Sequence, residues 1–151
     1  MNREATKVAI KRLHTDVKHP MYQTEHSAGM DLEAFMKEPM TIKPHERVII
    51  PTGIAIALPH GYEAQIRARS GMAAKFGVVP ANGVGTIDAD YRGEIGVILL
   101  NTSNEVFVVE PGMRVAQMVI TRYETVEWDE VEELEDTVRG AGGYGSTGVK
   151  Q

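Results

Sequence analysis

Along most of this chain, apolar residues alternate with small or polar ones in a period of two, and this alternation most constrains the fold. The alternating runs lie at residues 54–58, 62–69 and 95–99, and another begins at Val106 and Val108. A period of two places every second side chain on one face of a β-strand. Turn formers interrupt the runs at 43–45, 58–61, 101–104 and 110–112. Many short strands separated by turns predict an all-β sandwich or barrel.

One segment breaks the strand pattern and predicts a helix. Residues 71–77 follow the end of a strand run and lack its alternation, so we expect one short helix there. Ser70 stands just before it and is a residue type that caps helix N-termini well.

An acidic segment follows the last strand run. Residues 124–136 contain eight Asp and Glu residues. They could form a metal cluster, or the segment could be solvated and anchored by Val126, Trp128, Val131 and Leu134; we favour the second interpretation.

The end of the chain is rich in glycine. Five glycines fall between residues 140 and 148, which leaves little side chain to pack. We therefore expect a barrel domain at 1–136 and a flexible arm at 137–151.

Composition excludes several classes of function. The 151 residues suit a single domain, and without cysteine the chain has no disulfides or thiolate metal ligands. A net charge of −5 argues against a polynucleotide as partner, because nucleic-acid binding depends on Lys and Arg neutralising phosphates. The sequence contains no apolar run long enough for a signal peptide or a membrane span, so we expect a cytoplasmic protein that does not bind membranes.

Two patterns are misleading. Residues 140–145 match the dinucleotide-binding pattern G-x-G-x-x-G, but that motif needs a following helix and an acid about twenty residues on. The five histidines show no metal-ligand spacing, and neither a cysteine nor a Gly-x-Ser-x-Gly motif supplies a nucleophile. We therefore expect water to attack the substrate directly, without a covalent intermediate on the enzyme.

The segment 85–94, Gly-Thr-Ile-Asp-Ala-Asp-Tyr-Arg-Gly-Glu, carries the strongest chemical signal. With Asn82 just upstream, it suits a hairpin that grips a small polar ring and offers a carboxylate to a water molecule. Taken alone, the segment could also be an ordinary turn whose polar side chains have no role in chemistry.

Four other blocks add weaker signals. The sequence Arg69-Ser70-Gly71 offers a guanidinium, a hydroxyl and backbone N–H groups that suit phosphate oxygens, or else a plain helix cap. The others are an acid among small residues at 28–34, an arginine and an amide at 114–117, and the glycine-rich arm, each of which has a purely structural interpretation too.

Together, and in this order, the five blocks resemble the five motifs of the homotrimeric dUTP diphosphatase (dUTPase) family, from about residue 28 to residue 148. The matching positions are Ala28, Gly29, Asp31, Leu32 and Ala34; Arg69, Ser70, Gly71 and Ala73; Asn82, Gly85, Ile87, Asp88, Tyr91, Gly93 and Glu94; Arg114, Ala116 and Gln117; and the run from Arg139 to Gly148.

The resemblance implies a jelly-roll-like, distorted β-barrel that assembles as a homotrimer and hydrolyses dUTP to dUMP and pyrophosphate, limiting uracil in DNA and supplying dUMP for dTMP synthesis. The third motif, with Gly85 and Ile87, would bind uracil through backbone groups and Asn82. Tyr91 would stack on the deoxyribose and leave no room for a 2′-hydroxyl, and Asp88 would orient the attacking water.

The other motifs are implied to hold the triphosphate. Arg69, Ser70, Gly71 and Gln117 would bind phosphate oxygens, and Asp31 would help to place Mg²⁺ through its water shell.

The arm of one chain would close over nucleotide held by the others. Arg139 and Ser146 would reach the terminal phosphate, while Tyr144 would cover the base; Gly145 is implied to bind substrate as well. Two positions depart from the family pattern: Ala68 replaces the usual proline, and Tyr144 replaces the commoner phenylalanine.

Two alternatives remain. A dCTP deaminase, or a bifunctional relative, shares the fold but usually carries Arg-Ser-Ser where this chain has Arg69-Ser70-Gly71. A regulator could keep the fold and sense nucleotide without turnover, although the intact Asp88 argues against it.

Overall fold

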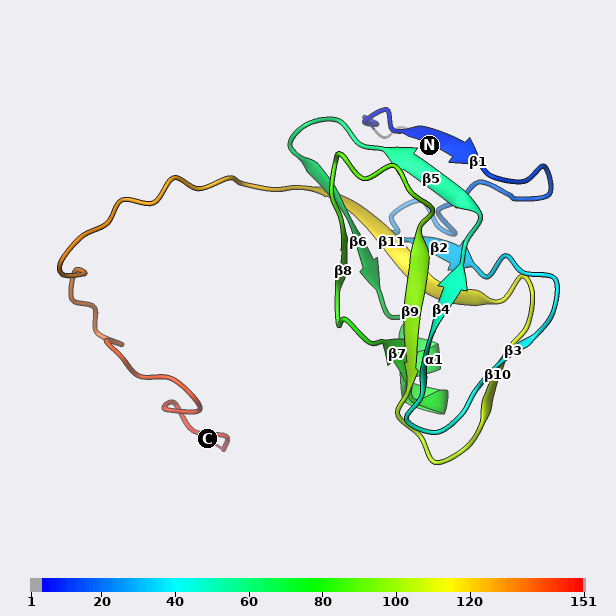
Figure 1. Cartoon of the computed structure of the whole chain (residues 1–151). Helices are drawn as coiled ribbons and strands as arrows, with labels where there is room; N and C mark the ends of the chain where they lie inside the picture. Colours follow the sequence, from blue (N-terminus) through cyan, green and yellow to red (C-terminus); the bar gives the residue numbers. More distant parts are fainter. Residues whose placement is uncertain (1–3, 151) are drawn as a thin grey trace.

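The computed structural model describes residues 4–150 and consists almost entirely of short β-strands (Figure 1). In chain order the elements are β1 (Ala9–Arg12), β2 (Met30–Glu33), β3 (Met40–Ile42), β4 (Arg47–Pro51), β5 (Ile54–Ala57), β6 (Tyr62–Arg67), α1 (Ser70–Phe76), β7 (Val78–Pro80), β8 (Gly85–Ile87), β9 (Gly96–Asn101), β10 (Phe107–Val109) and β11 (Arg114–Arg122). The all-β class and the single short helix predicted from the sequence are confirmed.

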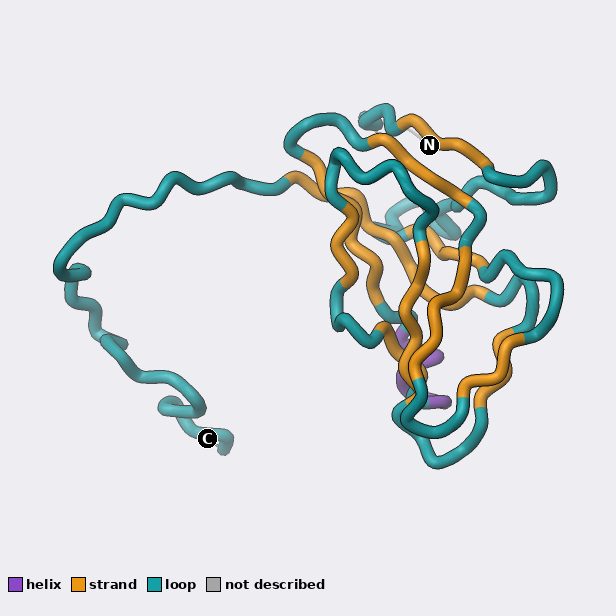
Figure 2. Tube along the Cα trace, viewed as in Figure 1, coloured by secondary structure: helices purple, strands orange, loops and turns teal. Residues whose placement is uncertain are grey.

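The strands pair antiparallel in four sheets that enclose one core (Figure 2). The largest has the order β2-β11-β6-β8, and the next β4-β9-β7; β1 pairs with β5, and β10 with β3. The long strand β11 contacts both β2 and β6, so it joins segments from the first half of the chain side by side.

The side chains that alternate along the strands also alternate between buried and less buried positions, as the period of two predicts. In β9, Val97 and Leu99 are fully buried, whereas Ile98 and Leu100 are only partly buried. The same alternation in β6 buries Ala64 and Ile66. The core is therefore assembled from one face of each strand.

The helix begins one residue earlier than predicted, and the predicted cap at Ser70 is wrong. Ser70 is the first helical residue, and the N-cap position falls on Arg69, which has an extended backbone and makes no side-chain cap bond. The carbonyl of Arg69 accepts the first helical hydrogen bond, from the N–H of Ala73 at 3.0 Å. The backbone conformation at Arg69, and not the residue type at 70, decides where the helix starts. Gly77 ends the helix in the left-handed region, at φ 66°.

The chain leaves the barrel after β11 and runs as an extended segment away from it (Figure 1). The predicted anchoring of the acidic part is wrong within one chain. The apolar residues Val126, Trp128, Val131 and Leu134 are 70%, 89%, 51% and 87% exposed. The segment extends away from its own barrel, so these side chains have no surface of the same chain to pack on.

Between residues 4 and 150, no helix is long and apolar enough to cross a lipid bilayer.

Candidate active site

The segment predicted as a hairpin forms a strand, a turn and a loop. β8 leads into a turn in which the N–H of Tyr91 donates to the carbonyl of Asp88 at 3.1 Å. β8 pairs with β6, whereas β9 after the loop pairs with β4 and β7. The hairpin prediction is therefore wrong, because this segment crosses from one sheet to another instead of pairing with itself.

A cavity of about 240 Å³ lies against this segment. Its lining includes all five residues that were predicted to hold the nucleoside and the water: Asn82, Gly85, Ile87, Asp88 and Tyr91. They come from the loop before β8, from β8 itself and from the turn that follows. The turn thus gathers amide, carboxylate and phenol groups around one small space.

Gly85 makes this gathering possible. A Cβ atom at this position would lie 3.1 Å from the Asn82 side-chain nitrogen and 3.1 Å from Cβ of Ile66. Glycine therefore lets the amide of Asn82 approach the strand closely enough to form one wall of the cavity.

Tyr91 forms another wall. Its hydroxyl donates a 2.8 Å hydrogen bond to the carbonyl oxygen of Glu94, which folds the side chain back along its own loop. The residue remains 44% exposed, so a ligand in the cavity can contact the ring.

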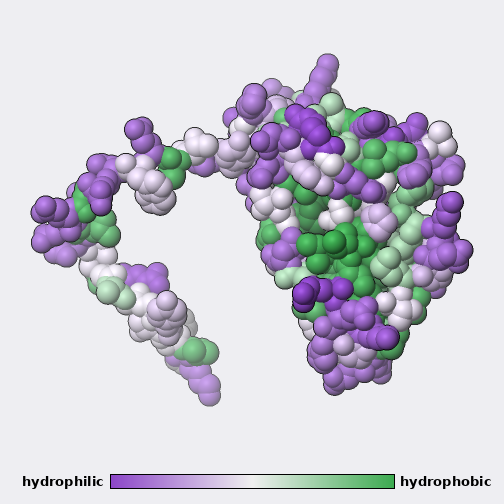
Figure 3. Space-filling model, in the orientation of Figure 1, coloured by the Kyte–Doolittle hydropathy of each residue, from purple (hydrophilic) through white to green (hydrophobic). Residues whose placement is uncertain are grey.

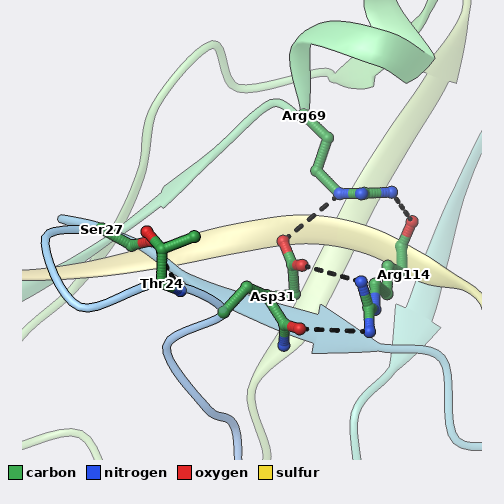
Figure 4. A network of polar contacts seen from close by, with 6 residues as sticks. Thr24, Ser27, Asp31, Arg69 and Arg114 are labelled. Atoms are coloured by element: carbon green, nitrogen blue, oxygen red, sulfur yellow. Dashed lines mark hydrogen bonds and ion pairs between the residues drawn. The ribbon is translucent and has the colours of Figure 1, made fainter.

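A second group of predicted residues gathers at the other end of β6, around the carboxylate of Asp31 (Figure 4). Nε of Arg69 lies 3.3 Å from one carboxylate oxygen, and Nη1 of Arg114 lies 3.6 Å from the other. Arg69 also donates to the backbone carbonyl of Arg114 at 3.1 Å, and Arg114 to Oε1 of Gln23 at 3.4 Å. Two guanidinium groups thus share one carboxylate, which leaves this end of the sheet locally positive in an acidic protein.

Gln117 joins this group through the sheet register. It pairs with Asp31 in β2 and with Arg67 in β6, and its Nε2 donates to the carbonyl of Ala68 at 2.9 Å. A Cβ at Gly29 would lie 2.5 Å from Oε1 of Gln117, so glycine at this position lets the amide keep its present place.

Ser70 and Gly71 complete the group at the start of α1. Both are exposed, and no heavy atom within 4 Å would meet a side chain at Gly71. Their backbone N–H groups and the Ser70 hydroxyl lie next to Arg69, a combination that suits an anion.

Arg114 also belongs to this group, although the sequence predicted it only as a match to the fourth motif and not as a site residue. A register shift between Arg114 and Ala116 interrupts the β2–β11 pairing just where this side chain turns toward Asp31. The spacing of Arg114 and Gln117 was the only sequence signal that linked Arg114 to the site. This spacing does not show that Asp31 of β2 is the partner of Arg114, because that contact depends on strand pairing.

The two groups lie far apart in a single chain. Ile66 of β6 pairs with Gly85 of β8, and Ala64 with Ile87, so Asp88 lies level with Glu63. Six residues of extended backbone separate that level from Arg69, which corresponds to about 20 Å. One chain therefore does not bring Asp88 to the cationic group.

The four arm residues predicted to bind substrate are also apart from both groups. Tyr144 is fully exposed at φ 50°, and Arg139 donates from Nε to the carbonyl of Gly142 at 2.8 Å. Ser146 donates its N–H to Gly143, and Gly145 has φ 86°, so the arm consists of successive turns. Figure 1 shows it reaching outward from the barrel.

The described part of the chain contains no cluster of three or more His, Cys, Asp or Glu residues that could hold a metal ion. Asp31 is the one predicted contributor, and its carboxylate is only 17% exposed and shared between two arginines. This donor set fits a cation that takes most of its ligands from phosphate and water, as Mg²⁺ does.

Comparison with known proteins places this arrangement among enzymes of nucleotide metabolism. A model of the dUTPase family matches residues 15–148. A deoxyuridine 5′-triphosphate nucleotidohydrolase from Rickettsia bellii (strain OSU 85-389) is 61% identical over 145 residues, which cover 95% of this chain and 97% of that protein. The protein of the same name from Rickettsia felis is 59% identical over 145 residues, which cover 95% of this chain and 98% of that protein.

The fold comparison agrees. The structure of the dUTPase of Staphylococcus bacteriophage 80alpha with dUPNHPP superimposes with a TM-score of 0.85 at 29% sequence identity. The superposition covers 96% of this chain and all of that one. The jelly-roll-like barrel predicted from the sequence is confirmed by this match.

Proposed function

The chain belongs to the dUTPase family, and from this membership we propose that it hydrolyses dUTP to dUMP and pyrophosphate. One observation carries the proposal to the level of residues: the amide of Asn82, the carboxylate of Asp88 and the ring of Tyr91 line one small cavity. An amide can pair with the polar edge of uracil, and a tyrosine ring can pack on a deoxyribose. The reaction would limit the dUTP available for DNA synthesis and supply dUMP.

In the proposed reaction, Asp88 positions a water molecule behind the α-phosphorus. It accepts a hydrogen bond and then the proton from this water, while the new P–O bond forms and the bond to the departing pyrophosphate breaks. The transition state spreads its charge over the phosphate oxygens, so the protein contributes mainly position and electrostatic stabilisation. The guanidinium of Arg69, the N–H groups at Ser70 and Gly71 and the amide of Gln117 supply that stabilisation.

Mg²⁺ is part of the proposal, with Asp31 contacting it through water. Asp31 would hold a bound Mg²⁺ through its water shell, and the ion would supply positive charge that offsets part of the charge on the triphosphate. The chain's own contribution is to hold Asp31 between two arginines, which fixes the carboxylate next to the phosphate-binding groups.

We further propose that the site forms between chains of a homotrimer. The separation of about 20 Å between Asp88 and Arg69 exceeds what one α-phosphate can bridge, so the two residues must come from different copies. The barrel also has apolar surface to cover: Ile49 of β4 is 65% exposed and pairs with Ile98, which lines the cavity. Figure 3 shows apolar side chains gathered in the middle of the barrel face in view.

The arm would complete the site of a neighbouring copy. Arg139, Tyr144, Gly145 and Ser146 have no contacts with the barrel of their own chain to break before they cross to another. A cytoplasmic location stays a prediction from the sequence.

The test is a substrate comparison with Mg²⁺. We expect pyrophosphate release from dUTP, and far slower release from dTTP, dCTP and UTP. Asp88→Asn keeps the shape but weakens the hold on water, and should lower kcat by about 10²–10⁴-fold with nucleotide binding retained. Ammonia release from dCTP would instead favour the deaminase, and binding of dUTP without turnover would favour a regulator.

A further inference from the structure

We propose that Gly93 and Glu94 are positioning residues that hold the Tyr91 ring in place, and thereby set the discrimination between dUTP and UTP. This inference rests on the proposed function. Both residues fall in the third motif, but the substrate-binding assignments above give them no role. The ring of Tyr91 folds back on the loop that contains these two residues, and Glu94 also lines the cavity.

Gly93 provides the space that the ring occupies. A Cβ atom at this position would collide with the Tyr91 hydroxyl oxygen and would lie 2.7 Å from Cζ and 3.0 Å from Cε1. Gly93 does not have a positive φ, so its role is room and not backbone freedom. Any side chain here must push the ring of Tyr91 away from the loop, because a ring at the end of a side chain yields more easily than backbone.

Glu94 provides the hydrogen-bond acceptor that fixes the tip of the ring. The Tyr91 hydroxyl donates to its backbone carbonyl at 2.8 Å. The N–H of the same peptide group belongs to Ile95 and donates to the carbonyl of Ile54 at 2.9 Å. Tyr91 is thus connected through one peptide group to the first residue of β5, and such a chain of hydrogen bonds reinforces each member.

The side chain of Glu94 adds a second attachment. Its Oε2 accepts a 2.8 Å hydrogen bond from the backbone N–H of Gly53. Gly53 lies in a closely packed place: it has φ 71°, and a Cβ there would lie 2.6 Å from Cγ2 of Val17 and 3.1 Å from the ring of Phe35. The carboxylate of Glu94 therefore ties the Tyr91 loop to a tightly packed turn between β4 and β5.

These attachments limit how far the ring can move toward or away from a bound sugar. Exclusion of a 2′-hydroxyl depends on a ring that cannot retreat by even the radius of one oxygen atom. If Gly93 or Glu94 is changed, the ring gains freedom, and a ribose should be tolerated better while dUTP still binds.

The test compares kcat/KM for dUTP and for UTP in purified variants, with Mg²⁺ present. Gly93→Ala and Glu94→Ala should each lower the dUTP/UTP ratio by about tenfold, the factor that corresponds to one lost hydrogen bond. Glu94→Gln should keep the wild-type ratio, because its amide oxygen can accept from the same N–H. Glu105→Ala removes an exposed acid from another loop and should leave the ratio unchanged.

A double-mutant cycle separates positioning from general damage. Tyr91→Phe removes the hydroxyl bond, so combining it with Glu94→Ala should change the ratio by less than the two effects added. Unchanged ratios in both Gly93→Ala and Glu94→Ala, or full additivity in the cycle, would overturn the inference. A wild-type protein that hydrolyses UTP as fast as dUTP, or neither, would overturn the proposed function and this inference with it.

Discussion

Two inactive variants of this protein should restore each other's activity when they assemble together. Asp88 and Arg69 lie at opposite ends of β6, about 20 Å apart along the strand, yet both are proposed to act at the same α-phosphate. A site must then take Asp88 from one chain and Arg69 from another. Asp88→Asn and Arg69→Ala damage the two halves separately, so a mixed assembly can contain intact sites.

The expected magnitude follows from chance. In a mixture of equal amounts that assembles at random, half of the Asp88 positions and half of the Arg69 positions are wild type. If each site takes the two from different chains, about one quarter of the sites are intact; if both come from one chain, none is. We therefore expect the mixture to show about a quarter of the wild-type rate.

The stability of the variants should not obscure the result. Arg69 loses one ion pair at 3.3 Å and one hydrogen bond at 3.1 Å, and its side chain is 34% exposed. The pair is partly buried, since the Asp31 side chain is 17% exposed, but Arg114 still holds Asp31, so the carboxylate keeps a cationic partner in the variant. Asp88 is exposed and should tolerate asparagine without loss of fold.

The assay denatures the two variants together, refolds them and measures pyrophosphate release from dUTP. Each variant refolded alone is the control, and wild type treated in the same way corrects for recovery. If the mixture is no faster than the average of the two separate variants, both residues act from the same chain, and the site is not divided between chains as the strand register implies.

Two further predictions concern the arm and the phosphate-binding group. Deleting residues 137–151 should leave a folded assembly with the wild-type oligomeric size by gel filtration but almost no activity, because none of the described residues 137–150 belongs to the core. An unfolded product would instead make the segment structural. Gly29→Ala places a Cβ 2.5 Å from Oε1 of Gln117, so the amide must rotate off the carbonyl of Ala68; we expect KM for dUTP to rise by about tenfold, and an unchanged KM would show that this amide does not hold phosphate.

Local sequence patterns predicted the elements well where one residue period determined them. The alternation at 54–58 and 62–69 became β5 and β6, and the break after it became α1. The prediction of the helix N-cap was wrong, because there the residue type and the backbone conformation indicated different positions. Ser70 favours a cap by its chemistry, but the extended backbone at Arg69 places the helix start one residue earlier.

The acidic segment shows a different kind of failure. Its apolar residues predicted an anchor, and no surface of the same chain covers them. A sequence reports that a side chain is apolar, but it does not report which chain will bury it. The same limit applies to the arm residues Arg139 and Tyr144, whose proposed partners lie in another copy.

The sequence by itself determined the strand-rich class, the short helix and the set of chemical groups, because these depend on residues near one another along the chain. Only the tertiary structure decided that Asp31 lies between Arg69 and Arg114, and that Asp88 lies at the other end of β6 from them. The reason is the strand register. The pairing of β11 with β2, and of β8 with β6, joins residues that are distant in sequence. The alternation within each strand stays the same when its partner slides by two residues, so the alternation alone does not determine which residues are paired.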